Sequence, residues 1–226
     1  MAVSRIRDAL LDMLFPCVRC MACGSVQKVT DGLCAQCREE MERYPLTGAG
    51  ACAVYIYEGA ARKLIHRMKF SGEYELPVRL FAAGMEKTLE DLKWDVDCVT
   101  AVPAAPETLR KRGYNQAEKL AKRLCRSTGL RYERQVLRKK RGTRSQVGLD
   151  ASGRRRNLMG AVLPGRRSET VRGKRVLLID DVYTTGATAK ACAQTLRACG
   201  AEEIYVLCAA RVADHALEKY LAGELE

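Results

Sequence analysis

The stretch from residue 175 to residue 201 constrains the fold of this chain more than any other. It begins with the apolar run Val176–Ile179 and continues with two acids, Asp180 and Asp181. A short, partly β-branched run of this kind is typical of a buried strand in a parallel sheet. Small hydroxyl residues follow, and residues 189–199 then show helical spacing before a glycine. We therefore expect a strand that ends in two acids, then a loop, then a helix.

The residues of this predicted turn suit one kind of ligand. The loop that enters the helix, here called the threonine loop, consists of Thr184, Thr185, Gly186, Ala187 and Thr188. A helix N-terminus presents free backbone N–H groups, and small residues let a phosphate approach them. The two carboxylates, here called the acidic pair, suit vicinal ribose hydroxyls or Mg²⁺. The pattern predicts a sugar 5′-phosphate site, and the alternative is an ordinary turn whose threonine caps the helix.

The run Asp180–Thr188, read as DDVYTTGAT, resembles the phosphoribosyl-pyrophosphate motif of type I phosphoribosyltransferases. In that family the two acids hold the ribose 2′ and 3′ hydroxyls and the threonine-rich loop holds the 5′-phosphate. The resemblance implies that Asp180 and Asp181 are the candidate catalytic residues. It also implies phosphoribosyl pyrophosphate or a related ribose 5-phosphate as the ligand, together with Mg²⁺.

Composition limits the remaining possibilities. The chain has 226 residues, enough for one sizeable core and a small appendage, and a net charge of +12 that favours nucleotides, pyrophosphates or nucleic acid as partners. No run approaches the roughly 18 apolar residues of a membrane span. Acids interrupt the N-terminal segment where a signal peptide would be apolar, so we expect a cytoplasmic location.

Five of the eleven cysteines lie between residues 17 and 37. Two Cys-x-x-Cys pairs separated by ten residues predict a closed structural zinc site with the ligands Cys20, Cys23, Cys34 and Cys37. Three alternatives stay open. Cys17 could replace one of the four ligands, the thiolates could hold an iron–sulfur cluster, or the thiols could be unrelated and buried.

Beyond residue 46 the pattern alternates between strands and helices, which predicts a type I phosphoribosyltransferase-like α/β fold with a parallel sheet. We place a domain boundary there, with a zinc-knuckle module at 1–46 and a phosphoribosyltransferase-like domain at 47–226. The expected strands are 52–57, 98–102, 176–179 and 204–208. The expected helices are 6–14, 39–44, 59–70, 76–89, one from residue 117, 189–199 and a last one after Asp214.

A basic cluster follows the second expected strand, in what we expect to be a loop. Because ligands bind beyond the carboxyl ends of parallel strands, this loop should face the same crevice as the acidic pair. Arg110 and Arg112 are therefore candidates for binding a pyrophosphate. The alternative is a solvated basic turn.

Three motifs in this order resemble the ComF family of bacterial competence-associated proteins. They are the cysteine pattern, the run Arg112-Gly-Tyr-Asn-Gln116 and the acidic motif at Asp180. The resemblance implies a role in DNA uptake, with single-stranded DNA and the competence helicase machinery as possible partners. One departure stands out, because family members usually read Val-Pro-Leu-His-Pro-Arg-Arg where this chain has Ala104 and Ala105. The lost ring and guanidinium groups count against tight pyrophosphate binding and ordinary transferase chemistry.

Residues 131–156 carry ten basic and two acidic side chains, and lack apolar periodicity. By resemblance this segment matches the mobile hood that closes over phosphoribosyl pyrophosphate in type I transferases. A second interpretation is a surface for nucleic-acid phosphates, and a third is a solvated charge run. The DNA or anion candidates are Arg138, Lys139, Lys140, Arg141 and Arg144.

Two classes of function remain. The first is a phosphoribosyltransferase, of unknown acceptor, acting in DNA uptake or in purine, pyrimidine or amine metabolism. The second is a non-enzymatic protein that binds single-stranded DNA or docks to the competence machinery. The sequence identifies no acceptor, because no stretch is typical of base recognition.

Overall fold

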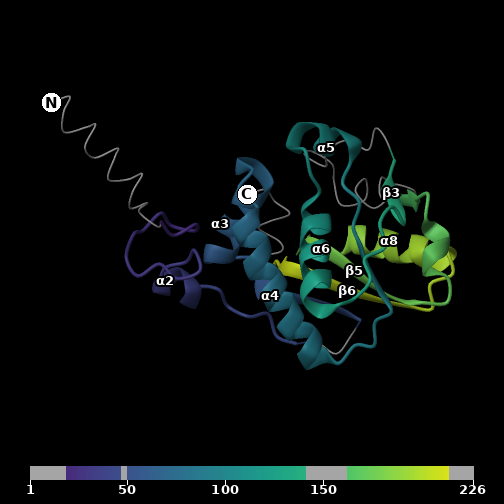
Figure 1. The fold of residues 1–226 in the computed structure, drawn as a ribbon, viewed down its shortest axis with the longest axis horizontal. Coiled ribbons are helices and arrows are strands. Elements are labelled where there is room, and N and C mark those ends of the chain that lie inside the picture. The colour runs from purple at the N-terminus through teal and green to yellow at the C-terminus, as the bar shows by residue number, and fades with distance from the viewer. Residues whose placement is uncertain (1–18, 47–49, 141–161, 214–226) are drawn as a thin grey trace.

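The computed structural model describes residues 19–46, 50–140 and 162–213, and its centre is a four-stranded parallel sheet (Figure 1). The strand order is β1-β6-β5-β2, and all three neighbouring pairs are parallel. The bounds are Ala51–Ile56 for β1, Cys98–Ala101 for β2, Arg175–Tyr183 for β5 and Glu203–Arg211 for β6. The expected α/β fold with a parallel sheet is confirmed.

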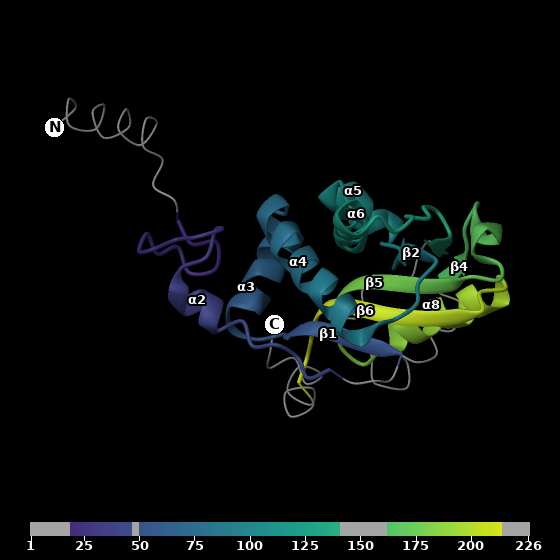
Figure 2. The same ribbon diagram turned by 60° about the horizontal axis from the view of Figure 1, so that its bottom comes forward.

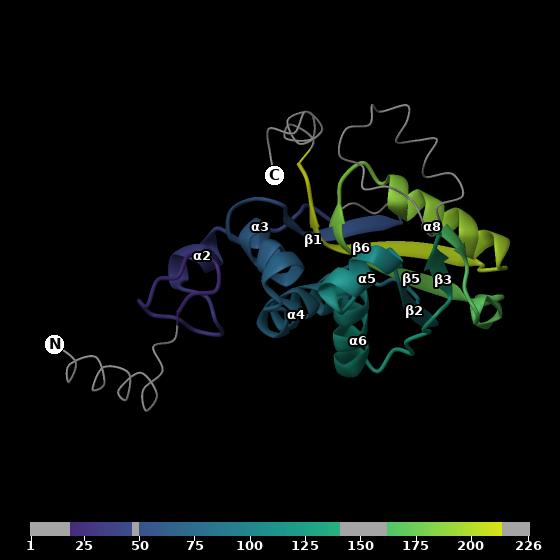
Figure 3. The same cartoon turned by 90° about the horizontal axis from the view of Figure 1, so that it is seen from above.

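Helices cover both faces of this sheet. Helix α8 (Ala187–Ala198) lies on one face, and α4 (Glu75–Leu92) and α6 (Gln116–Thr128) lie on the other (Figures 2 and 3). The remaining elements are α2 (Ala35–Glu39), α3 (Gly59–His66), the π-helical turn η1 (Arg67–Ser71), α5 (Pro106–Arg112), the antiparallel pair β3 (Leu137–Lys139) and β4 (Val162–Pro164), and η2 (Ser168–Val171).

The central strand β5 explains why the apolar run dominates the fold. Val176, Leu177, Leu178 and Ile179 are all fully buried, because β5 has a neighbour on each side and helices above and below. We had expected the strand to end at the two acids, but β5 continues to Tyr183. Val182 and Tyr183 still pair with β6, so the acidic pair lies two residues before the end of β5.

Three expected elements differ in the structure. The helix expected at 39–44 lies at Ala35–Glu39 instead, where the second cysteine pair begins it. The helix expected at 59–70 is α-helical only to His66, and its last turn widens into the π-helical η1. The basic segment at Arg110 and Arg112 is not a loop, because Pro106 begins the short helix α5.

Part of the basic segment 131–156 forms a strand where we had expected a loop. Arg138 and Lys139 belong to strand β3, which pairs with β4. The expected N-terminal helix 6–14, the segment after Asp214, and the candidates Arg141 and Arg144 lie outside the described residues. No helix in the ranges that the structure describes has the length and apolar character needed to cross a membrane.

One acid in the basic segment is buried. The Glu133 side chain is only 2% exposed and lies 2.7 Å from Arg131, 3.7 Å from Lys174 and 3.8 Å from Arg167. Its carbonyl accepts a hydrogen bond from the Thr100 hydroxyl of β2. Glu133 therefore ties the segment leading to β3 to the sheet, and part of the local positive charge is neutralised inside the fold.

Replacement of Glu133 by glutamine should destabilise the fold, because three basic groups lose a buried carboxylate. We expect a loss of about 1–3 kcal/mol in the free energy of unfolding, measured by denaturant titration. Glu118→Gln, which breaks a half-exposed pair with Lys122 on α6, should cost less than about 1 kcal/mol. Equal effects of the two variants would contradict this role.

Candidate functional site

The acidic pair lies near the carboxyl end of β5, and Val182 and Tyr183 separate it from the threonine loop. The Asp180 carboxylate accepts a hydrogen bond from the backbone N–H of Asp181 at 2.8 Å, and the Asp181 carboxylate accepts one from Val182 at 2.8 Å. Both side chains are half-buried. Two neighbouring carboxylates repel each other, and either a nearby cation or the protonation of one acid relieves this repulsion.

Lys69 supplies such a cation. Its ammonium lies 3.1 Å from Oδ2 of Asp181, and the two side chains are 24% and 16% exposed. Burial alone would lower the pKa of Lys69, but the charges of Asp181 and, more weakly, of Tyr57 and Asp180 raise it above the usual value. Lys69 is therefore charged and held against the acidic pair.

Asp180 has the more perturbed carboxyl group. Burial raises its pKa well above the usual range, and the charge of Asp181 raises it further. The backbone N–H of Asp181 and the charges of Lys69 and Lys139 act in the opposite direction. Lys139 thus lies near enough to influence the acidic pair, although it comes from β3.

The threonine loop leads from the end of β5 into α8. Gly186 begins the helix with φ +71°, and a Cβ at this position would lie 2.2 Å from the Tyr183 hydroxyl, so glycine is required here. Thr185 Oγ1 accepts a weak hydrogen bond from the Ala187 N–H at 3.4 Å. Gly186 at the N-cap position has no side chain that could cap the helix, so apart from this weak contact of Ala187 the first N–H groups of α8 are available to a ligand.

The two pyrophosphate candidates occupy α5. Arg110 is 75% exposed and pairs with Glu107 of the same helix at 3.5 Å. The Arg112 guanidinium lies 5.6 Å from the ring centre of Phe70, which follows Lys69 in η1. The described contacts direct Arg110 along its own helix and Arg112 toward the η1 turn.

The run Gly113–Gln116 instead connects α6 to η1. The Tyr114 hydroxyl and the Gln116 amide both donate to the Met68 carbonyl, at 2.6 and 3.2 Å. The Asn115 amide donates to the Val102 carbonyl at 2.9 Å, and its oxygen caps α6 through the N–H of Ala117. This motif therefore fixes the turn that carries Lys69.

The anion-binding candidates Arg138, Lys139 and Lys140, on β3 and directly after it, differ in their surroundings. Neighbouring residues of a strand point to opposite faces. Arg138 is exposed and donates to the Pro164 carbonyl at 3.0 Å, whereas Lys139 is half-buried and close enough to Asp180 to lower its pKa. Lys140 is exposed and follows the strand. Only Lys139 of these three is brought toward the acidic pair.

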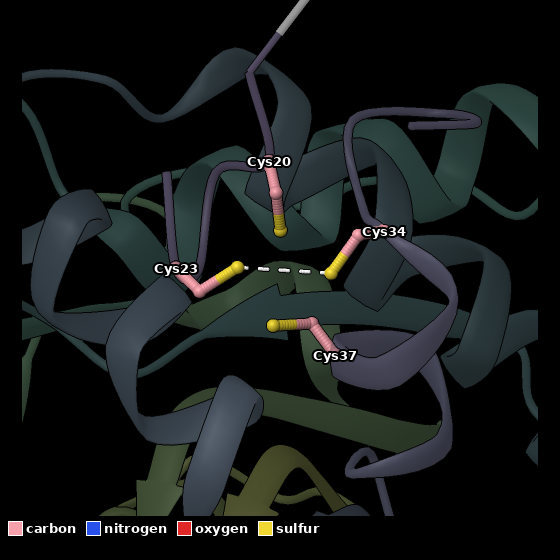
Figure 4. Close-up of side chains that lie close together, drawn as sticks. All are labelled: Cys20, Cys23, Cys34 and Cys37. Atoms are coloured by element: carbon pink, nitrogen blue, oxygen red, sulfur yellow. Dashed lines mark hydrogen bonds between the residues drawn. The ribbon is translucent and has the colours of Figure 1, made fainter. Parts of the chain in front are cut away.

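The four predicted metal ligands come together in the N-terminal region. The sulfurs of Cys20, Cys23, Cys34 and Cys37 all lie within 4.8 Å of one another and converge on one point (Figure 4). The Cys23 and Cys34 sulfurs are 3.6 Å apart, close to the roughly 3.8 Å edge of a tetrahedron with zinc–sulfur bonds of about 2.3 Å. The donor set and spacing of these four cysteines fit a structural zinc, and Cys17 lies outside the described residues.

The cysteine site has the electrostatics of a metal centre. Burial acts to raise the pKa of Cys20, but backbone N–H groups of Cys34, Cys23 and Ala22 outweigh it and lower the pKa to about 6. Burial and the neighbouring thiols raise the pKa of Cys37. Close thiolates of this kind are stable together only when a cation binds them.

This module packs directly on α4. A Cβ at Gly32 would lie 1.8 Å from the Leu76 side chain, so the second knuckle touches the first turn of that helix. Further along α4, the Arg43 guanidinium donates to Thr88 Oγ1 at 3.2 Å. The metal site therefore supports a helix that covers the sheet.

Two family models match the chain. The model of the phosphoribosyl transferase domain matches residues 108–221, which include the acidic pair and the threonine loop. The chain belongs to the phosphoribosyl transferase domain family. The model of the double zinc ribbon domain matches residues 10–58, and together with the cysteine cluster it supports a structural zinc.

Curated relatives confirm the resemblance to ComF proteins. The chain is 28% identical over 220 residues to Competence protein F of Haemophilus influenzae, covering 85% of this chain and 95% of that one. It is 28% identical over 207 residues to the DNA utilization protein YhgH of Escherichia coli K12, covering 85% and 89%. Competence protein ComFC of Streptococcus pneumoniae is 30% identical over 158 residues, covering 70% and 66%.

Solved structures are more distant. Mycobacterium tuberculosis orotate phosphoribosyltransferase, in complex with 5-phospho-alpha-D-ribosyl 1-diphosphate, is 19% identical with a TM-score of 0.43, covering 74% of this chain and 82% of that one. Glutamine phosphoribosylpyrophosphate amidotransferase from B. subtilis is 23% identical with a TM-score of 0.40 and covers 58% of this chain. This chain spans about a quarter of that enzyme, or 26%.

Removal of the metal should unfold the N-terminal module and weaken the whole chain, because α4 loses its support. In Cys37→Ser we expect zinc content to fall below one per chain and the melting temperature to drop by about 5–10 °C, corresponding to a few kcal/mol. Metal analysis and calorimetry measure both quantities. Cys199→Ser, a half-buried thiol after α8, is the matched control and should change neither. A full zinc content in Cys37→Ser would contradict the assigned ligand set.

Proposed function

We propose that this chain binds phosphoribosyl pyrophosphate or a related ribose 5-phosphate at the end of β5. The observation that carries the proposal is that the acidic pair, the threonine loop and the N-terminus of α8, whose N-cap residue is a glycine, follow one another at the end of β5. Asp180 and Asp181 would accept hydrogen bonds from the ribose diol. Thr184, Thr185, Gly186, Ala187 and Thr188 would surround the 5′-phosphate with N–H and hydroxyl donors.

The oxygen donors of this site fit Mg²⁺, which prefers carboxylates and phosphate oxygens and keeps several waters. When bound, Mg²⁺ would neutralise the charge of a leaving diphosphate. The chain's own residues would hold the ribose between the acids and the loop. With an acceptor present, the C1–oxygen bond to the diphosphate would break as the acceptor forms its bond to C1.

The biological setting follows from the relatives. Proteins named for competence and for DNA utilization match 85% of this chain, so we propose a role in the handling of DNA taken up by the cell, in the cytoplasm. The proposal includes the phosphoribosyltransferase-like domain at 47–226 and docking to the competence helicase machinery. Transfer to a purine, pyrimidine or amine acceptor is the metabolic form of the same chemistry.

Calorimetric titration with phosphoribosyl pyrophosphate and Mg²⁺ tests the site. Asp180→Asn with Asp181→Asn should weaken binding at least tenfold, because the diol loses both acid side chains that accept its hydrogen bonds. Burial raises the folded pKa of Asp180 above its unfolded value, so its contribution to stability is lost as pH rises; Asp180→Asn alone should therefore not destabilise the fold at pH 7. Undiminished binding by the folded double variant would contradict the proposal.

A second candidate function, binding of single-stranded DNA, is favoured by a groove along α6. The groove has a volume of about 690 Å³ and is lined by five basic residues and two acids: Arg79, Lys119, Lys122, Arg123, Arg126, Glu75 and Glu118. The cations of α6 recur every three or four residues and thus form one stripe. Within the described ranges, Arg123 and Arg126 are exposed and have no side-chain partner.

The aromatic rings beside this groove do not favour base stacking. Tyr74 and Tyr114 pair with each other at 4.4 Å, and the Lys119 ammonium lies 4.3 Å from the Tyr74 ring centre. Both rings therefore already make contacts, and the exposed charged side chains of α6 in the groove are the cations Lys122, Arg123 and Arg126. We propose that the groove binds the phosphate backbone of a single strand without sequence preference.

Fluorescence anisotropy with a dT oligonucleotide at several salt concentrations tests this second function. Arg123→Gln with Arg126→Gln should weaken binding about tenfold and reduce the log–log salt slope by roughly 1.4, at about 0.7 per phosphate. Arg172→Gln with Arg197→Gln, two exposed arginines elsewhere, is the matched control and should change little. If only neutralisation of Arg138, Lys139, Lys140 and Arg141 abolishes binding, the DNA surface lies in residues 131–156 instead.

A further inference from the structure

Lys69 lies in a turn whose backbone is held in place by burial and by hydrogen bonds to the start of α6. Lys69 follows Met68, which is fully buried, and the Met68 carbonyl accepts two side-chain hydrogen bonds from the start of α6. Those donors, the Tyr114 hydroxyl and the Gln116 amide, belong to a segment that is itself tied to the end of β2 through Asn115. These hydrogen bonds hold the turn so that the ammonium of Lys69 lies beside the Asp181 carboxylate.

Lys69 places a positive charge beside two neighbouring acids. Two adjacent carboxylates at a sheet edge need a positive charge if both are to accept hydrogen bonds from a diol. A divalent cation with oxygen ligands is one source of that charge. An ammonium at 3.1 Å from Asp181 is another, and it is already present in the protein.

We propose that Lys69 is the resident cation of the acidic pair, and that the site therefore binds ribose 5-phosphate monoesters without a divalent cation. This inference rests on the proposed function and narrows its ligand class. The β2–α5 loop supports it, because Ala104 and Ala105 offer no side-chain donor for a diphosphate. The two arginines that could have bound a diphosphate make other contacts, Arg110 with Glu107 and Arg112 with Phe70.

The role of Lys69 is that of a positioning and charge-balancing residue for the diol-binding acids. The ribose hydroxyls would meet two acids whose negative charge is partly compensated by the Lys69 ammonium of η1. The 5′-phosphate would lie at the threonine loop, where the N-terminus of α8 supplies its own positive potential. Mg²⁺ would then be required only by ligands that bring a diphosphate.

Titration of ribose 5-phosphate into the full chain, with EDTA and separately with Mg²⁺, tests the proposal. The wild type should bind with the same Kd in both conditions, within about twofold. Lys69→Met should bind at least tenfold more weakly in EDTA and recover in Mg²⁺, because the metal replaces the lost charge. Lys69→Arg should stay within a few-fold of the wild type, and Lys63→Met, an exposed lysine of α3, should be unchanged.

The hydrogen bonds that hold the Lys69 turn allow a second test that leaves Lys69 itself unchanged. Tyr114→Phe with Gln116→Leu removes both donors to the Met68 carbonyl and should shift the EDTA titration in the direction of Lys69→Met. If Lys69→Met does not fold, the two wild-type titrations still decide the matter.

The failures of the two proposals are distinguishable. A wild type that binds ribose 5-phosphate only with Mg²⁺, or a folded Lys69→Met that binds normally in EDTA, overturns the role of Lys69 and leaves the ribose-phosphate site intact. Absence of binding of both ribose 5-phosphate and phosphoribosyl pyrophosphate, with and without Mg²⁺, overturns the proposed function and this inference with it.

Discussion

The ion pair between Lys69 and Asp181 joins elements that are far apart in the chain. Lys69 comes from η1 and Asp181 from the central strand β5, so this contact joins the turn between α3 and α4 to the carboxyl end of the sheet. Coulomb attraction in a half-buried setting is stronger than at the surface, and the neighbouring acid Asp180 increases the demand for positive charge. The arrangement of η1, the start of α6 and the threonine loop around β5 is consistent with this single requirement.

A series of packing contacts and hydrogen bonds connects the metal site to the acidic pair. The cysteine module packs against α4, and α4 packs on the sheet face that also carries α6. The Tyr114–Gln116 segment at the beginning of α6 then holds the Met68 carbonyl and so the turn of Lys69. A structural zinc at one end of the molecule therefore helps to hold the surroundings of the acids in place.

The parts of the site that depend on local patterning could be predicted from the sequence. The apolar run before Asp180, the hydroxyl loop and the cysteine spacing each describe a short segment whose geometry follows from its own residues. Lys69 could not be predicted, because a π-helical turn changes which side chains share a face and its partner lies more than a hundred residues away. Arg110 and Arg112 were expected in a loop, but Pro106 favours a helix start and places them on α5. Glu133 is an acid in a basic segment, and only the tertiary fold reveals that it is buried.

The most direct measurement is a crystal structure of the protein with ribose 5-phosphate bound in the absence of a divalent cation. Our account predicts the ribose diol on Asp180 and Asp181, the phosphate on the backbone N–H groups of the threonine loop, and the Lys69 ammonium still beside Asp181. A ligand found in the α6 groove instead, or a diol-free acidic pair with the phosphate elsewhere, would contradict it.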